Sequence, residues 1–125
     1  AHAGWRGLAG GVIAATVASL GIPAGQLLVW LGPAIGPDAF EVGEEVRAEF
    51  LGLDAGHADC FRRSSTGRWL ANLYQLARRQ LQALGVSEIY GGDCCTFSDP
   101  ARFFSYRREP RTGRMASAIW LDPGT

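Results

Sequence analysis

The sequence predicts an α+β fold in which helices cover a mixed β-sheet. Segments with helical spacing alternate with short apolar runs bounded by glycine, and two alternating segments near the C-terminus suggest a hairpin. A chain of 125 residues suits one domain or part of one. We treat residues 1–125 as a single unit. Because it opens directly on a dense polar and glycine cluster, we expect it to be the C-terminal portion of a larger domain.

The first half of the chain is expected to hold two helices and one buried strand. Leu8–Leu20 carries apolar residues at helical spacing, and a glycine and a proline follow it. Gln26–Leu31 is a continuous apolar run between glycines, which favours a buried strand. The rigid loop Gly32–Pro37 comes next, and an amphipathic helix is then expected over Phe40–Phe50.

The second half is expected to contain a loop, a helix, a strand and a hairpin. Gly52–Thr66 lacks periodicity and predicts a loop. Gly67–Leu84 shows the clearest helical pattern of the chain, and Val86–Tyr90 predicts a strand. Turn residues separate Arg102–Arg108 from Met115–Leu121, so these two segments predict an antiparallel hairpin.

Composition narrows the function classes. The 12 basic residues, all of them arginine, balance 12 acidic residues, which argues against nucleic acid or an anionic membrane as the main partner. The longest apolar stretch, Val12–Leu20, is too short to span a bilayer. Three cysteines, two of them adjacent, make a poor disulfide framework, so a reducing, cytoplasmic setting is expected. The sequence leaves the oligomeric state open.

Two regions near predicted helices carry residues that could bind a ligand. His2 precedes a glycine-rich turn and could ligate a metal, although a lone histidine is more often structural. Arg6 lies at the start of the first predicted helix, where an anion would be favoured, and its alternative role is a surface ion pair. His57 and Cys60 have a spacing compatible with a metal, but two ligands are too few for a site.

The last third of the chain adds a thiol pair and an arginine pair. Cys95 follows a predicted strand and could be a nucleophile, but no base is evident nearby and a packed thiol is the simpler interpretation. In the predicted strand, Tyr106 and Arg108 share one face and Arg107 lies on the other. One of the two arginines can therefore face a given pocket, while the aromatic residues can equally be core.

Several motifs together resemble the YfiH-type family, which is also called the multicopper polyphenol oxidase or laccase-domain family. The resemblance extends in order from Ala1 to Leu121, and is weakest over Leu51–Gly67. It is carried by the motifs His2–Gly7, Trp30–Pro37, Phe40–Gly43, Phe103–Arg108 and Thr112–Ser117.

The resemblance implies a layered α/β/β/α fold and a zinc-dependent enzyme acting on purine nucleosides. It implies adenosine and inosine phosphorolysis and adenosine deamination, with small-molecule nucleoside and phosphate as partners. His2 matches one of two histidine zinc ligands, and Cys95 matches a cysteine near the family's pocket. The other histidine and the cysteine ligand would lie before Ala1, so we expect the 125-residue segment alone to be inactive.

The same resemblance assigns roles to the arginines and leaves two alternative functions. Phosphorolysis needs a cationic pocket for phosphate, which Arg6 with Arg107 or Arg108 would supply, while Tyr106 would contact the substrate. One alternative is a laccase-type polyphenol oxidase with copper, which is disfavoured because copper centres need many histidines and this chain has two. The other is a cysteine-hydrolase-like editing factor for peptidoglycan precursors, with Cys95 as a candidate nucleophile.

Overall fold

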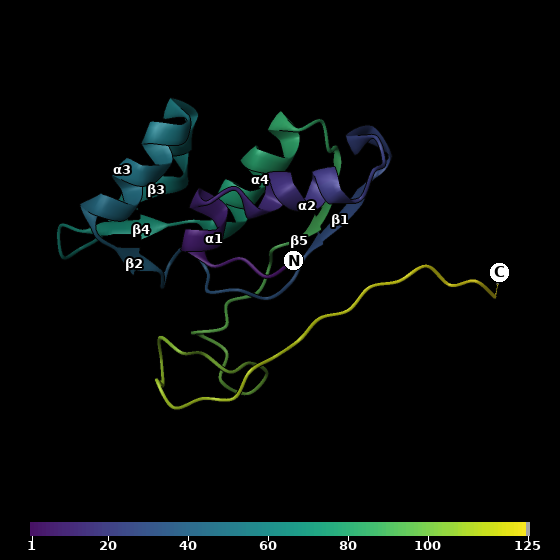
Figure 1. Ribbon diagram of the computed structural model, residues 1–125. Helices are drawn as coiled ribbons and strands as arrows, with labels where there is room; N and C mark the ends of the chain where they lie inside the picture. The colour runs from purple at the N-terminus through teal and green to yellow at the C-terminus, as the bar shows by residue number, and fades with distance from the viewer. Residues whose placement is uncertain (125) are drawn as a thin grey trace.

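The computed structural model of the chain describes residues 1–124, which contain four α-helices and two small sheets (Figure 1). The α-helices are α1 (Trp5–Ala9), α2 (Val12–Ser19), α3 (Glu44–Leu53) and α4 (Leu73–Ala83). Two 3₁₀ helices are η1 (Ala24–Gln26) and η2 (Ala55–Cys60). The strands are β1 (Leu28–Leu31), β2 (Glu41–Val42), β3 (Phe61–Arg63), β4 (Trp69–Ala71) and β5 (Glu88–Gly91).

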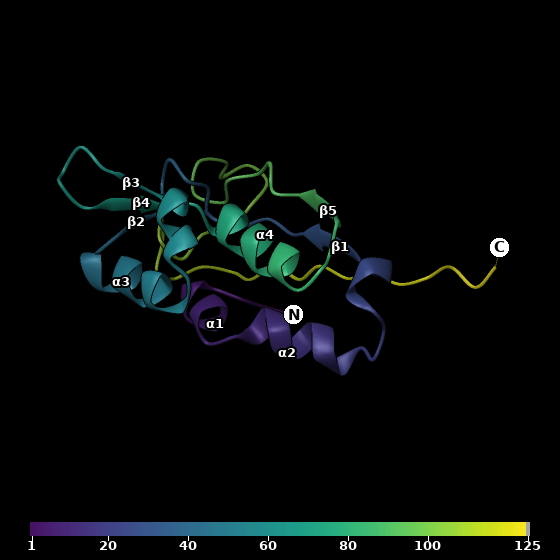
Figure 2. The same cartoon turned by 90° about the horizontal axis from the view of Figure 1, so that it is seen from above.

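The two sheets differ in strand direction, so the predicted mixed α+β class is confirmed. Strands β1 and β5 pair in parallel, with Leu28 opposite Glu88 and Leu31 opposite Gly91. Strands β2, β4 and β3 form an antiparallel sheet in that order. Helices α1, α2 and α4 lie on one side of β1 and β5, and the C-terminal segment runs along the other side (Figures 1 and 2).

Helix α4 forms the centre of the fold because it is amphipathic and well capped. The side chain of Asn72 accepts a hydrogen bond from the amide of Gln75 at 3.0 Å, which satisfies one of the free donors at the helix start. The helix buries Leu73, Tyr74, Leu76, Ala77 and Leu81. The predicted helix Gly67–Leu84 is therefore confirmed from Leu73 onward, while its first residues form β4 instead.

The predicted helix Leu8–Leu20 is in fact two helices, and glycine explains the break. Gly11 has a φ of 90°, a left-handed conformation that residues with a side chain adopt at a cost. Helix α1 ends before this position and α2 begins after it. The chain consequently turns between the helices, and both can pack against α4.

Two other boundaries differ from the sequence expectation. The predicted helix Phe40–Phe50 begins only at Glu44, because Glu41–Val42 pairs with β4. The expected loop Gly52–Thr66 contains η2 and β3. The strands predicted over Gln26–Leu31 and Val86–Tyr90 are confirmed as β1 and β5 within two residues at each end.

The predicted C-terminal hairpin is wrong. Residues 102–108 form turns, held by hydrogen bonds from the amide of Phe103 to the carbonyl of Asp99 and from that of Glu109 to Ser105. Residues 115–121 are extended without a strand partner among residues 1–124, and Trp120 and Leu121 are exposed (Figure 1). Alternating aromatic residues imitate a strand pattern, but a strand needs a neighbour for its backbone donors and acceptors.

The hydrophobic core lies where α3 and α4 meet the antiparallel sheet. Phe50 and Leu76 are fully buried there, and Phe61 packs against Phe50 with ring centroids 5.9 Å apart. Within residues 1–124, no helix combines the length and apolarity needed to cross a membrane.

Candidate functional site

A pocket forms where the loops after β1 and β5 meet. Because the two strands are parallel neighbours, their carboxyl ends lie at the same edge, which is where open α/β sheets commonly bind ligands. The cavity has a volume of about 310 Å³, and we call it the two-loop pocket. It is lined by Gly36, Pro37, Asp38, Tyr74, Gly92, Asp93, Cys94, Cys95 and Ser98.

The phenol of Tyr74 ties the two loops together from the helix beneath them. Its oxygen accepts a hydrogen bond from the amide of Ala34 at 2.7 Å and donates to the carbonyl of Cys94 at 2.8 Å. A further backbone bond runs from the amide of Thr96 to the carbonyl of Ala34 at 3.0 Å. Burial raises the pKa of the Tyr74 phenol, so the group stays protonated and keeps donating at neutral pH.

Cys95 lies in a cluster of hydrogen-bond donors. The amide of Gly36 donates to its sulfur at 3.2 Å, and the hydroxyl of Ser98 lies 3.4 Å from the same atom. Burial opposes ionisation of the thiol, but hydrogen bonds from Ser98 and from the amides of Gly36, Ser98 and Phe97 outweigh it, so the pKa of Cys95 is lowered. The sulfur of Cys95 is therefore held by specific hydrogen bonds in addition to its packing contacts.

Gly36 is required for this approach. A Cβ atom added there would lie 3.1 Å from the Cβ and 3.3 Å from the sulfur of Cys95, which is closer than side chains normally pack. The glycine thus lets a backbone amide face the thiol directly. The loop Gly32–Pro37 therefore directs one backbone amide, that of Gly36, at the thiol of Cys95.

The arginine pair is divided between two tasks. The guanidinium of Arg108 donates to the carbonyls of Thr96, Phe97 and Phe103 at 2.8–3.0 Å, and so holds the turns of the C-terminal segment to the pocket loop. Arg107 is exposed and donates a single hydrogen bond, to the carbonyl of Glu41 at 2.9 Å.

Tyr106 and the two N-terminal candidates are exposed. Tyr106 keeps 74% of its surface open to solvent. His2 makes no side-chain hydrogen bond within residues 1–124, and Arg6 places its guanidinium 4.7 Å from the ring of Trp5. The structure thus brings Cys95 and Arg108 to one loop cluster, while no hydrogen bond or ion pair links His2 or Arg6 to that cluster.

The described residues do not hold a metal by themselves. Within residues 1–124 there is no group of three or more histidine, cysteine, aspartate or glutamate side chains that could bind one. His2 therefore belongs to no three-ligand site for zinc or for copper within residues 1–124.

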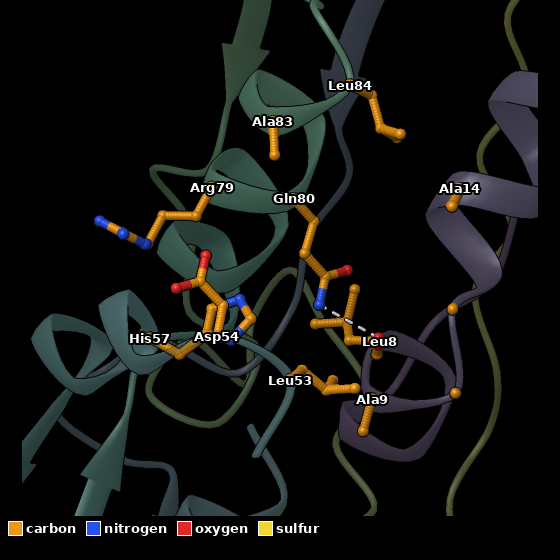
Figure 3. Close-up of a pocket in the computed structure, with 12 residues that line it drawn as sticks. Leu8, Ala9, Ala14, Leu53, Asp54, His57, Arg79, Gln80, Ala83 and Leu84 are labelled. Atoms are coloured by element: carbon orange, nitrogen blue, oxygen red, sulfur yellow. Dashed lines mark hydrogen bonds between the residues drawn. The ribbon is translucent and has the colours of Figure 1, made fainter. Parts of the chain in front are cut away.

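His57 and Cys60, whose spacing suggested a metal, belong to no group of three metal-ligating side chains within residues 1–124, and both are buried. The His57 ring lies 5.6 Å from that of Phe50, and burial raises the pKa of the Cys60 thiol to about 11. A second cavity, of about 410 Å³, touches His57 and lies between α1, α2 and α4 (Figure 3). None of the six residues predicted to form the functional site lines this second cavity.

Sequence reasoning missed Tyr74, Gly36 and Ser98 as parts of the site. Tyr74 follows the apolar face of its helix and looked like an ordinary core residue. A signal existed for Gly36, since its loop combines two prolines with two glycines. Nothing in the pattern distinguishes Ser98 from other loop serines.

Comparison with known proteins identifies a family that matches nearly the whole chain, and curated relatives that share the name purine nucleoside phosphorylase. The family described as "Multi-copper polyphenol oxidoreductase laccase" matches residues 1–122. A purine nucleoside phosphorylase of Pseudomonas aeruginosa is 61% identical over 122 residues, which cover 97% of this chain and 50% of that protein. The purine nucleoside phosphorylase YfiH of Escherichia coli is 53% identical over 121 residues, covering 97% of this chain and 49% of that protein.

Solved structures have the same fold. A Neisseria meningitidis protein superposes with a TM-score of 0.93 and 50% identity over 98% of this chain and 50% of its own. The protein YlmD of Geobacillus stearothermophilus gives a TM-score of 0.78 and 34% identity over 90% of this chain and 44% of its own. The chain therefore spans about half the length of the relatives it matches.

Proposed function

The chain belongs to the family described as multi-copper polyphenol oxidoreductase laccase, and we propose that the complete protein is a purine nucleoside phosphorylase. The observation that carries this proposal is the similarity to two bacterial proteins of that name, at 61% and 53% identity. Both matches extend over 97% of the chain, so the similarity includes the two-loop pocket.

The proposed reaction is the attack of phosphate on the ribose carbon of adenosine or inosine, with the purine as leaving group. Phosphate binding needs cationic donors, and Arg6 and Arg107 are exposed and can turn toward an anion at small cost. We assign Arg108 to positioning, because its guanidinium already serves three carbonyl groups. Trp5, Phe104 and Tyr106 are candidates for stacking on the base.

We further propose that the complete protein binds one zinc ion, with His2 as a ligand, and deaminates adenosine as well. His2 alone does not make a zinc site, so the remaining ligands would come from residues outside this chain. A bound zinc would supply Lewis-acid activation in such a reaction. We also propose a cytoplasmic location, which suits nucleoside and phosphate as substrates and is supported by the three free thiols.

Two alternative functions follow from specific observations. The family description favours a copper-dependent polyphenol oxidase. The donor cluster around Cys95 favours a hydrolase in which this thiolate is the nucleophile, as in editing of peptidoglycan precursors.

The test is an assay of the full-length protein with adenosine and inosine, with and without phosphate. We expect phosphate-dependent release of free purine and ribose phosphate, and release of inosine from adenosine. Arg6→Ala should weaken phosphate use by about one to two orders of magnitude, since a charge-assisted contact contributes roughly 1.5–3 kcal/mol. Arg111→Ala, another exposed arginine, is the matched control and should leave phosphate use unchanged.

A second variant tests the metal assignment. His2→Ala should lower both the zinc content of the purified protein and its turnover. Unchanged zinc content and turnover would remove His2 from the site, and oxidation of phenols without any nucleoside turnover would favour the oxidase instead.

A further inference from the structure

The second cavity, between helices α1, α2 and α4, plays no part in the proposed function. We call it the interhelical groove; its volume is about 410 Å³, a size that suits a small organic molecule (Figure 3). We propose that this groove binds a small organic cation with a compact apolar body, whose ammonium group bonds to Asp54 and His57.

Small residues and a helix break create the groove. Helix α1 ends at Ala9, and the chain turns at Gly10 and Gly11 before α2 begins. A Cβ atom at Gly10 would lie 3.1 Å from the carbonyl oxygen of Arg6, so this turn favours glycine. Ala14 and Ala83 face the groove with small side chains, which leaves space where larger residues would fill it.

The groove is spanned by a fixed contact. The side-chain amide of Gln80 on α4 donates to the carbonyl of Leu8 at the end of α1, at 3.1 Å. Leu8 is buried, so this bond holds α1 and α4 at a constant spacing in the core side of the groove. Figure 3 shows Gln80 reaching from α4 to Leu8 between the two walls. A ligand therefore meets walls that are already in place.

His57 offers an unused acceptor at one end of the groove. Its ring is only 4% exposed, and Nδ1 lies 2.8 Å from the carbonyl oxygen of Phe50. Because a carbonyl oxygen only accepts, Nδ1 carries the hydrogen, and Nε2 of the neutral ring holds a lone pair. No group within residues 1–124 makes a hydrogen bond with Nε2, although the residue lines the groove. A ligand N–H group would satisfy this acceptor.

Asp54 adds a negative charge beside it. One carboxylate oxygen, Oδ1, accepts a hydrogen bond from the amide of Gly56 at 2.8 Å, and Oδ2 has no partner in the described part of the chain. Asp54 and His57 both line the groove, and Figure 3 draws them among its lining residues. The groove lining thus offers two acceptors, the charged Oδ2 of Asp54 and the neutral Nε2 of His57, and an ammonium group supplies donors for both.

The rest of the groove lining indicates what the other end of the ligand should be. Away from Asp54 and His57 the groove is lined mainly by aliphatic side chains, with Leu53 and Leu84 exposed at its rim. Burying this surface would favour a ligand whose body is apolar. A compact ring or short branched chain on a primary amine has this combination of properties.

Arg79 is the competing group, because it is the cation that lines the groove. Figure 3 shows its guanidinium directed away from α1 and α2, past η2. Its Nη1 lies 4.0 Å from the carboxylate of Asp59, which does not line the groove. The positive charge of Arg79 is thus partly balanced by Asp59 outside the groove, and its guanidinium lies against Gly56 of η2.

The experiment titrates the full-length protein with benzylammonium chloride and follows the imidazole ¹⁵N resonances of His57. We expect saturable binding with a shift of the Nε2 resonance. Asp54→Asn should weaken binding by about fivefold or more, as expected for loss of a charge-assisted contact. Asparagine can still accept from the amide of Gly56, so this variant keeps the cap of η2 and should remain folded.

Two controls separate this proposal from general charge effects. Glu49→Gln removes one negative charge from the exposed side of α3 without touching the groove or Arg79, and should leave binding unchanged. His57→Gln should abolish the imidazole signal and weaken binding as Asp54→Asn does. The proposal is overturned if Glu49→Gln weakens binding as much as Asp54→Asn, if no saturable shift occurs, or if sodium benzoate binds more tightly, which would assign the groove to anions held by Arg79.

Discussion

The hydroxyl oxygen of Tyr74 lies 2.7 Å from the amide nitrogen of Ala34 and 2.8 Å from the carbonyl oxygen of Cys94. One side chain of α4 thereby joins the loop after β1 to the loop after β5. These loops carry Gly36 and Cys95, so the distance between that amide and that thiol depends on Tyr74. The geometry of the two-loop pocket therefore depends on Tyr74, which also lines it.

The first prediction is that Tyr74→Phe destabilises the protein and loosens the pocket. The variant leaves the amide of Ala34 and the carbonyl of Cys94 without their partner, which costs about 1–3 kcal/mol in the free energy of unfolding. Urea denaturation of the full-length protein measures this loss. The matched control is Tyr106→Phe, because that side chain is 74% exposed and its hydroxyl makes no hydrogen bond within residues 1–124, so its removal should change stability little. Equal losses for both variants would contradict the role of Tyr74.

The second prediction concerns the order in which the thiols react. The pKa of Cys95 is lowered, so its reactive thiolate forms at lower pH than that of an ordinary cysteine. Cys60 is buried and its pKa is raised to about 11. We expect iodoacetamide at neutral pH to label Cys95 in the folded protein and Cys60 only after unfolding, as read by peptide mass spectrometry. Ser98→Ala should slow labelling of Cys95, whereas labelling of Cys60 first would refute the assignment.

The third prediction is a pH dependence of stability that arises from Cys60. Folding raises the pKa of this thiol to about 11, whereas the thiol of an unfolded chain has a pKa of about 8.5. Between these two values the folded protein retains a proton that the unfolded chain has released. The stabilisation is complete below the unfolded pKa and is lost as pH rises toward about 11. Denaturation midpoints measured at increasing alkaline pH should fall more steeply for the native protein than for Cys60→Ala. Parallel pH profiles would show that the thiol does not contribute.

The fourth prediction separates the two neighbouring arginines. Arg108→Ala removes hydrogen bonds to three carbonyl groups and should raise amide hydrogen exchange across residues 96–108. Arg107→Ala removes one exposed bond to Glu41 and should leave that exchange unchanged. If the proposed phosphate role of Arg107 is correct, its loss should raise the phosphate KM instead. An identical exchange pattern in both variants would contradict this division.

Elements with a clear pattern of apolar residues could be predicted from the sequence. Segments whose structure is decided by whether another strand pairs with them could not. The apolar spacing of 73–84 gave the helix α4, and the apolar runs gave β1 and β5. The segment 69–71 has apolar residues that fit a helix equally well, and only its pairing with Glu41–Val42 makes it a strand. The tail 102–121 alternates like a hairpin but has no partner in the described residues.

The candidate site was predictable at the level of loops and less so at the level of contacts. The composition of the loop Gly32–Pro37 was compatible with presenting amides or with a plain connection, and the structure directs the amide of Gly36 at Cys95. The sequence could not show that Arg108 is occupied by backbone carbonyls, because those carbonyls approach it only through turns that no periodicity predicts. The roles of His2 and Arg6 remain predictions that their exposed positions do not test.

The fifth prediction concerns the face of β1 and β5 opposite the helices. Leu28, Trp30 and Tyr90 are exposed there, with Trp30 at 48% of its surface, so the C-terminal segment that runs along this side covers the face only in part, whereas parallel strands are normally covered on both faces. Since the relatives are about twice as long, we expect residues outside this chain to cover this face in the complete protein. Trp30→Glu in the full-length protein should therefore lower the free energy of unfolding by about 3 kcal/mol or more, because it places a charge in a buried layer. Leu20→Glu is the control, because Leu20 is similarly exposed, at 53%, but lies at the end of α2, away from this face, and its substitution should have little effect. If both substitutions are tolerated equally in urea denaturation, then the face is open to solvent in the complete protein as well, and the second layer of the α/β/β/α arrangement does not pack on it.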